Sequence, residues 1–396
     1  MEIHVEKSKI SADLRTSRGN FDQIPFDLIP EVFKGLPVKA LARFLCVSKE
    51  CESIIRNRDF MKSYLVKSSS SRPRSLVFTL KDTKLRTWKH FFFSVSQPQN
   101  RGASSSSSFV ATYHMNCHSQ PYTTYSASVH GLICHGHPSK LMVYNPSTRG
   151  SITLPRIDSE RVDMHHFLGY DPVSGDYKVL CFTPDDAFAF GQSFRVLTLG
   201  KENSWRIVQD YPLHFLDHPY SPDICIDGVL YYGVCLDNEE THAVMCFDVR
   251  SEKFDLIKLP DITSRISCLR LTSYEGTLAV LFTGDSRGRF NLWVLKDAVK
   301  HEWSKNEYVL PPSDGETYDH FRPFCVANGG EVVLAPLFVF CKEPYSVIYY
   351  NIKKNAVRRV YIEGIFTELK EPLWDKDSYH CTFSVFPAQI DNLMFL

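Results

Sequence analysis

Five consecutive residues, Gly284-Asp285-Ser286-Arg287-Gly288, fit the G-x-S-x-G pattern that carries the nucleophilic serine of many hydrolases. In those enzymes a strand precedes the serine and a helix follows it, and the strained turn between them exposes the hydroxyl. Here the flanking runs, Leu278–Thr283 and Phe290–Leu295, both have the composition of strands. The sequence therefore predicts a hairpin tip at Ser286 and no nucleophilic serine.

A second group of residues has the types and spacing of zinc ligands. His114 and Cys117 form one pair, Cys134 and His137 form another, and sixteen residues separate the two cysteines. Two such pairs could hold Zn²⁺ tetrahedrally through sulfur and imidazole nitrogen. Both pairs lie in strand and turn sequence, however, where successive side chains point to opposite faces of a sheet. Zinc is therefore the less favoured interpretation, and we predict no metal and no other cofactor.

The remaining residues that could carry chemistry lack the context that catalysis requires. No Walker or dinucleotide-binding loop stands between a strand and a helix in the sequence. The pairs His165-His166 and Asp185-Asp186 have no partner pattern that points to catalysis. We therefore predict that the chain is not an enzyme.

Composition and charge exclude several classes of protein. The chain has 396 residues and a formal net charge of zero, which argues against a surface that follows nucleic-acid phosphates. The longest apolar run, Val332–Cys341, has the length of a strand and contains Pro336, so no membrane span is expected. Twelve cysteines without regular spacing indicate reduced thiols. We expect a cytoplasmic or nuclear protein with no membrane or nucleic-acid partner.

The elements that would position functional residues change character near residue 70. Residues 24–66 carry apolar side chains at helical spacing, which predicts three or four short helices. Pro37 suits the first position of the second helix, Ser48 can cap the third, and Asn57 or Asp59 can cap the last. A block this small commonly presents apolar surface to a partner.

After this block the sequence consists of short strand-like runs separated by Gly, Asp, Asn and Pro. Ser68–Pro73 is predicted as a turn, and Ser104–Ser108 as a flexible, low-complexity excursion between strands. Four units of turn, strand, loop and strand each begin at a glycine, namely Gly131, Gly228, Gly276 and Gly330. The last two gaps are 48 and 54 residues, and the first, 97, is about two units.

Spacing near fifty residues with several strands per unit is typical of kelch-like β-propellers. The expected fold is therefore a small all-α module followed by an all-β domain, a kelch-like β-propeller of about six blades. A β-sandwich of comparable length is the alternative, because irregular loops blur the period.

Residues 24–55 resemble the F-box. The matching strings are Ile24-Pro25, Asp27-Leu28, Leu36-Pro37-Val38-Lys39 and Cys46-Val47-Ser48-Lys49. The family usually has a Trp two residues after the last of these lysines, and Cys51 stands there instead. A Trp-to-Cys change removes a large apolar contact, on the order of a few kcal/mol in a packed core. The stability of the module and its affinity for an adaptor therefore depend on this position.

The rest of the chain is similar to the plant F-box-associated domain. Phe167-Leu168-Gly169-Tyr170-Asp171-Pro172-Val173 resembles its most recognisable string, and Ile226-Asp227-Gly228-Val229 and Leu292-Trp293-Val294-Leu295 follow in the expected order. Residues 1–20 are polar and unpatterned, which predicts a disordered leader. The two resemblances imply an F-box helical module at 21–67 and an F-box-associated all-β domain at 68–396.

Together they imply a plant F-box protein with a C-terminal F-box-associated interaction domain. Such a chain would be the substrate-receptor subunit of an SCF-type (Skp–cullin–F-box) E3 ubiquitin ligase. Its helical module would bind a Skp-family adaptor, and through it a cullin, while the β domain would recruit an unknown protein target for ubiquitination.

The resemblance also implies which residues bind the adaptor: Ile24, Pro25, Leu28, Ile29, Leu36, Pro37, Val38 and Leu41. Some of these apolar side chains must pack inside the module instead. The competing interpretation is an adaptor-independent binding protein whose propeller recognises a protein or a small molecule.

Overall fold

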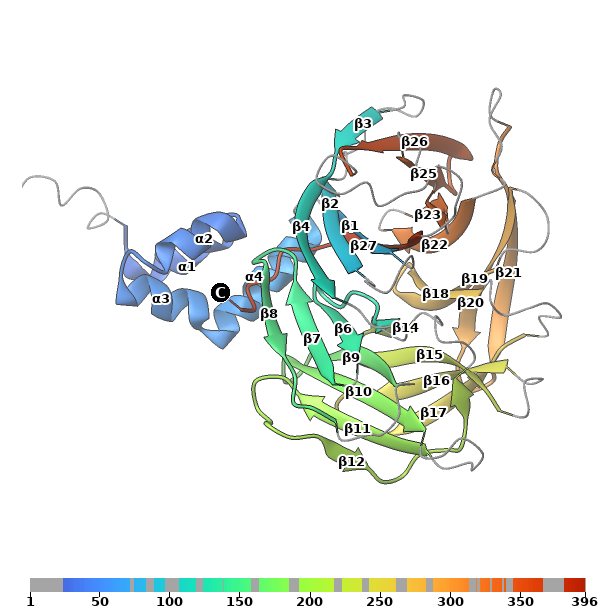
Figure 1. Ribbon diagram of the computed structural model, residues 1–396, viewed down its shortest axis with the longest axis horizontal. Coiled ribbons are helices and arrows are strands. Elements are labelled where there is room, and N and C mark those ends of the chain that lie inside the picture. Colours follow the sequence, from blue (N-terminus) through green and yellow to red (C-terminus); the bar gives the residue numbers. More distant parts are fainter. Residues whose placement is uncertain are drawn as a thin grey trace, which may run out of the picture.

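The computed structural model describes residues 24–71, 75–82, 89–96, 107–118, 124–137, 139–157, 164–184, 192–216, 223–236, 242–260, 269–282, 288–312, 318, 321–327, 330–336, 338–339, 345–365 and 381–395. Within them the chain forms a helical module beside six β-sheets arranged in a ring (Figure 1). The prediction of a propeller of about six blades is confirmed, and the β-sandwich alternative is wrong.

The helical module is built from short elements, two of which have a side-chain N-cap. They are η2 (Phe26–Leu28), α1 (Ile29–Lys34), α2 (Val38–Phe44), α3 (Lys49–Arg56) and α4 (Arg58–Ser71). The Ser48 hydroxyl accepts a hydrogen bond from the Cys51 amide at 3.2 Å, as the sequence predicts for an N-cap. Asn57 Oδ1 accepts from the amides of Asp59 at 2.9 Å and Phe60 at 3.1 Å, which confirms the second predicted cap.

The prediction of a turn at Ser68–Pro73 is wrong for its first four residues, because α4 continues to Ser71. The Ser69 hydroxyl donates to the carbonyl of Val66 at 2.8 Å, and this bond satisfies the side chain without interrupting the helix. Ser68 is fully buried. Tertiary packing therefore extends a helix that its serine-rich sequence disfavours.

Each sheet is one blade, with its strands in order from the axis of the ring outward. Blade 1 contains β24 (Phe338–Val339), β27 (Cys381–Gln389), β1 (Ser75–Asp82), β2 (Lys89–Ser96) and β4 (Thr112–His118). Blade 2 contains β5 (Thr124–Tyr125), β6 (Ile133–His137), β7 (Lys140–Asn145) and β8 (Gly150–Thr153). Blade 3 contains β9 (His165–Asp171), β10 (Asp176–Pro184), β11 (Gln192–Thr198) and β12 (Arg206–Val208).

The other three blades repeat this pattern with additions at their edges. Blade 4 contains β14 (Asp223–Ile226), β15 (Val229–Cys235), β16 (His242–Asp248) and β17 (Phe254–Lys258), and β13 (Phe215–Leu216) also pairs with β15. Blade 5 contains β18 (Leu269–Tyr274), β19 (Thr277–Phe282), β20 (Arg289–Asp297) and β21 (Glu302–Val309). Blade 6 contains β22 (Phe321–Ala327), β23 (Glu331–Pro336), β25 (Tyr345–Asn351), β26 (Ala356–Glu363) and β3 (Ser107–Val110).

The predicted glycines lie at the hairpin turns that begin the blades. Gly131, Gly228, Gly276 and Gly330 have φ angles of 83°, 87°, 85° and 77°. In the β14–β15 and β18–β19 turns the preceding residues, Asp227 and Glu275, also have positive φ, at 46° and 51°. Two successive residues with positive φ make the type I′ turn, whose twist matches that of the flanking strands. The repeated glycine is therefore a requirement of the turn, as the period in the sequence indicated.

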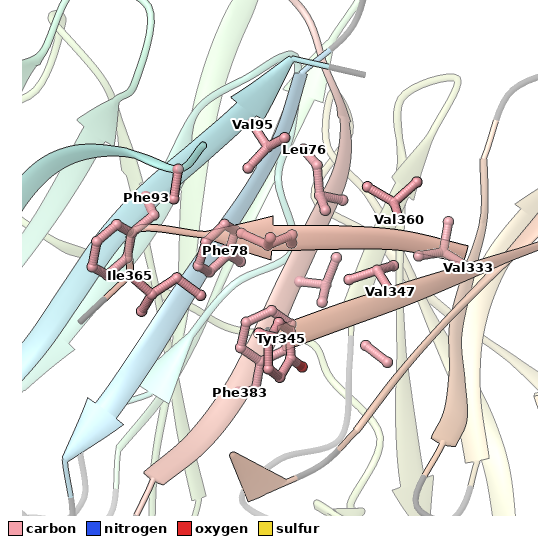
Figure 2. Close-up of a cluster of buried hydrophobic side chains, with 14 of the residues drawn as sticks. Leu76, Phe78, Phe93, Val95, Val333, Tyr345, Val347, Val360, Ile365 and Phe383 are labelled. Carbon is pink, nitrogen blue, oxygen red and sulfur yellow. The ribbon is translucent and has the colours of Figure 1, made fainter. Parts of the chain in front are cut away.

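The ring is closed by pairing the two ends of the domain within blade 1. Strand β27 runs antiparallel to β1, with Phe78 opposite Val385 and Leu80 opposite Phe383. The same strands contribute to the largest apolar cluster, which lies between blades 1 and 6 (Figure 2). In it, the Phe78 ring stacks on Phe93 with centroids 5.3 Å apart.

A second connection between blades 1 and 6 comes from β3. Its residues run parallel to β26, with Ser107 opposite Val360 and Val110 opposite Glu363. Ser107 and Ser108, which the sequence predicts to belong to a flexible excursion, are therefore strand residues. The rest of that predicted excursion lies outside the described residues.

The interface between blades 1 and 2 combines apolar, aromatic and polar side chains. Val77, Ile133 and Phe386 form a small buried apolar cluster, and the buried Phe92 ring packs against Tyr144 with centroids 5.3 Å apart. Beside them lie two buried histidines, His90 of β2 and His135 of β6.

These histidines have few polar partners. Neither ring nitrogen of His90 has a hydrogen-bond partner within the described residues, and the same holds for His135 Nε2 and the Tyr125 hydroxyl. The His90 and Tyr125 rings lie 4.8 Å apart, and His135 Nδ1 lies 4.0 Å from the Cys117 sulfur. A buried polar group without a partner costs free energy, so this interface is a weak part of the ring.

We predict that acid destabilises the propeller through these histidines. Burial lowers the pKa of His135 to about 4, and burial, followed by the charge of Lys81, holds the pKa of His90 well below its ordinary value. The unfolded chain, with histidine pKa values near ~6.5, therefore binds protons first as the pH falls. Each such histidine should lower the free energy of unfolding by about 1–2 kcal/mol between pH 7 and pH 5. Urea unfolding at both pH values measures this, and equal midpoints would contradict it.

We also predict that His90→Phe stabilises the propeller. Phenylalanine keeps most of the ring volume and removes two buried nitrogens that lack partners, which should raise the free energy of unfolding by about 1 kcal/mol at pH 7. The substitution also removes one titrating group, so the gain in the free energy of unfolding should be larger at pH 5 than at pH 7. Urea unfolding tests both statements, and a destabilised variant would show that His90 has a polar role.

Candidate functional site

An exposed apolar strip covers the first turns of the helical module. Ile24, Phe26, Leu28 and Val32 are 39%, 60%, 48% and 50% exposed, and they lie within nine consecutive residues. Large apolar side chains so concentrated at a surface are typical of an interaction site. We call Ile24, Phe26, Leu28 and Val32 the apolar strip.

Local geometry holds the apolar strip outward. The Leu28 amide donates to the Pro25 carbonyl at 2.9 Å, which closes the η2 turn and leads directly into α1. Along α1 the neighbouring Phe33 turns inward and is only 1% exposed, so Val32 must face out. A Glu31–Lys34 ion pair at 2.6 Å lies on the outer surface of the same helix.

The residues predicted to bind an adaptor divide into three groups by burial. Ile24, Pro25, Leu28 and Pro37 are exposed; Ile29 and Leu36 are partly buried against the core of the module; Val38 and Leu41 are buried, at 4% and 0% exposure. The last pair can reach a partner only if the module opens.

Sequence reasoning missed four exposed apolar residues of the module: Phe26, Val32, Val47 and Val66. Adjacent apolar pairs such as Val32-Phe33 could have indicated these exposed residues, because only one member of such a pair can face the core of the module. The periodicity alone did not say which one.

The core beneath the strip contains Cys51 and a residue from the far end of the chain. Its buried members are Phe33, Val38, Leu41, Cys51, Ile55, Phe60, Tyr64 and Leu393. The Tyr64 hydroxyl donates to the Leu36 carbonyl at 3.0 Å, which satisfies the buried phenol. Cys51 is 7% exposed, so the small side chain at the usual Trp position is a core residue.

The module stands on one face of the propeller. Arg58 and Lys201 both pair with the Asp176 carboxylate, the latter at 2.6 Å, and Lys62 donates to the Val173 carbonyl at 3.4 Å. Burial opposes ionisation of Asp176, but the hydrogen bonds from Lys201 and Ser174 and the charge of Arg58 outweigh it and lower its pKa. The carboxylate therefore stays charged and links α4 to the turn between β9 and β10.

The opposite face of the ring carries the longer connections. In blades 3 to 6 the first and second strands are separated by two to four residues, whereas the second and third full-length strands are separated by six to eight. Because the strands alternate in direction, the longer connections leave from the face away from the β9–β10 turn and thus from the module. Longer loops on a rigid scaffold are common positions for recognition residues.

The histidine and cysteine pattern that has the spacing of zinc ligands does not form a zinc site in the described residues. His114 is hydrogen-bonded to Ser94 at 2.7 Å and to Tyr144 at 3.0 Å, and His137 to Ser139 at 3.0 Å. The described part of the chain holds no group of three or more His, Cys, Asp or Glu residues that could bind a metal ion. Ser286 and Asp185-Asp186 lie outside the described residues, although the flanking β19 and β20 are strands, as predicted.

Two further properties concern the described residues as a whole. Nine of their cysteines are free thiols. None of their helices is both long and apolar enough to cross a membrane.

Comparison with known proteins matches both parts of the chain. Residues 21–63 match the F-box domain, and residues 75–390 match the F-box associated beta propeller domain. The second match covers most of the chain after the F-box. The F-box-associated domain therefore makes up most of the protein and is not a short C-terminal segment.

Arabidopsis thaliana proteins are similar over nearly the full length. "F-box protein At2g21930" is 53% identical, with 99% of this chain and 98% of the relative covered. "Putative F-box protein At4g38870" is 41% identical over 95% of this chain and 89% of the relative. "F-box protein DOR" is 38% identical over 87% of this chain and 89% of the relative.

We predict that restoring the usual residue at position 51 destabilises the module. Cys51 is buried in the same core as the rings of Phe33, Phe60 and Tyr64, and the larger side chain of Cys51→Trp would have to displace its neighbours in that core. Overpacking of this kind costs about 1–3 kcal/mol. Thermal unfolding followed through the helical signal measures the effect. A stabilised Cys51→Trp variant would show that the module is underpacked here, and Cys51→Ala serves as the small-residue control.

Proposed function

Because the chain belongs to the F-box proteins that carry an F-box-associated β-propeller, we propose that it is the substrate-receptor subunit of an SCF-type E3 ubiquitin ligase. The observation that carries the proposal is the apolar strip on the F-box, which leaves four large apolar side chains open to a partner. In this proposal the strip and the exposed Pro25 and Pro37 contact a Skp-family adaptor, which in turn binds a cullin.

The contribution of the chain to ubiquitination is proximity. One end holds the adaptor, the other holds a protein target, and the target is presented at high effective concentration to the ubiquitin-charged enzyme. Bond formation takes place on partner proteins, so the chain itself needs no catalytic group. This role places the protein in the cytoplasm or the nucleus, and the free thiols are compatible with either.

The target would bind on the face of the propeller away from the module. The proposal is supported by the connections of six to eight residues on that face of blades 3 to 6, where the first and second strands are joined on the module's face by only two to four residues. A target held there leaves the apolar strip free for the adaptor.

We predict that the apolar strip, and not the buried pair of the motif, determines adaptor affinity. The double variant Phe26→Ala, Val32→Ala should bind a purified Skp-family adaptor at least about tenfold more weakly with an unchanged fold, because both side chains are exposed. Leu41→Ala should lose about 2–5 kcal/mol of stability instead, since Leu41 is fully buried. Calorimetric binding and thermal unfolding on the same samples separate the two effects.

The matched control is Val299→Ala, an equally small truncation at a 90% exposed valine of blade 5. It should leave adaptor binding unchanged. If wild-type protein does not bind any Skp-family adaptor, the ligase proposal fails and the adaptor-independent binding protein becomes the better account.

A further inference from the structure

The end of the chain returns to the helical module. After β27 ends at Gln389, residues 390–395 leave blade 1 and run along the face on which the module stands (Figure 1). Leu393 is 3% exposed and belongs to the core of the module together with Phe33 and Tyr64. A residue from the far end of the sequence therefore completes the F-box core.

The residues on either side of Leu393 are held by the propeller. The Asn392 side chain donates to the His130 carbonyl at 2.9 Å and to the Tyr177 hydroxyl at 3.0 Å. The fully buried Asn145 donates in turn to the carbonyls of Asn392 at 3.1 Å and Met394 at 2.7 Å. Two side-chain amides thus fix the backbone on both sides of Leu393 to blades 2 and 3.

The propeller backbone is also shaped to receive this segment. A Cβ atom at Gly131 would lie 2.4 Å from the Ile390 carbonyl oxygen, and one at Gly150 would lie 2.8 Å from the Phe395 Cβ. Both glycines therefore allow a close approach that any larger residue would prevent. Met394 and Phe395 add apolar contacts with the cluster between blades 2 and 3.

Other contacts also join the module to the propeller. They include the polar contacts that Arg58 and Lys62 of α4 make with Asp176 and with the Val173 carbonyl. Arg58 is half exposed, so its pair with Asp176 is screened by solvent and gives modest orientation energy.

We infer that residues 390–395 act as a strut that fixes the orientation of the F-box on the propeller, with Leu393 as the positioning residue. The effect of this strut on ubiquitin transfer rests on the proposed function. A fixed module holds the propeller at one distance from the charged enzyme, whereas a loosened module spreads that distance and lowers the effective concentration of any bound lysine.

The test measures orientation directly in the full-length protein. One dye replaces the exposed Glu50 of α3, and the other replaces the exposed Lys300 of blade 5, each attached through an unnatural amino acid. Single-molecule energy transfer between them reports the distance between the module and the propeller. Wild type and the conservative Leu393→Met should give one narrow distribution. Leu393→Ala and Asn392→Ala should each give a distribution at least twice as wide. Unchanged widths in both alanine variants would overturn the strut.

The two alanine variants remove different contacts of the strut: Leu393→Ala removes its contact with the module, and Asn392→Ala removes its contacts with the propeller. If one variant fails to fold, the other still tests the strut. If circular dichroism shows that Leu393→Ala has lost its helices, Asn392→Ala decides, because its side chain contacts only the propeller and the segment itself. Val299→Ala is the control for an unrelated truncation and should remain narrow.

A second readout needs no knowledge of the target. In a reconstituted complex with adaptor, cullin and charged enzyme, self-ubiquitination should modify a small, fixed set of propeller lysines, mapped by mass spectrometry. Asn392→Ala should enlarge this set, and Leu393→Met should leave it as in wild type. An unchanged set in Asn392→Ala would overturn the positioning role. If wild type shows no ligation at all, the proposed function fails, and the distance measurement still decides the strut.

Discussion

The pairing of β27 with β1 closes the ring, and both the propeller and the helical module rely on it. A propeller whose first and last strands did not pair would expose the edges of blade 1 and the large apolar cluster that this blade shares with blade 6. The strand that closes the ring is also the last strand of the chain, so its register fixes where the following residues emerge. Leu393, the fourth residue after this strand, enters the F-box core. The closure therefore orders both the propeller and the adaptor-docking module.

The energetic character of the interfaces differs around the ring. The blade 6–1 interface is apolar and aromatic, whereas the blade 1–2 interface also contains buried histidines with ring nitrogens that lack partners among the described residues. Polar groups in such a position are expensive unless they are paired, so local opening should begin there. Blade 1 thus has a strong interface on one side and a weak one on the other.

Much of the fold could be predicted from the sequence because it depends on local chemistry. Glycines with positive φ mark the hairpins, and Ser48 and Asn57 cap helices that follow them directly in sequence.

The candidate site could be predicted only in part. Helical periodicity identified Val38 and Leu41 as apolar face residues, but their burial depends on packing between helices that no local pattern encodes. Contacts between residues distant in sequence left no periodic signal either. The role of Leu393 depends on a register set more than three hundred residues from its partners in the module, and β3 pairs with a blade at the other end of the domain.

Hydrogen exchange of the intact protein, with and without a purified Skp-family adaptor, would locate the docking surface on the chain. We expect slower exchange on adaptor binding in residues 24–37, around the apolar strip, and unchanged exchange in the turns on the far face of the propeller. An adaptor that protects the propeller and leaves residues 24–37 unchanged, or that protects neither, would contradict the assignment of the apolar strip as the docking surface.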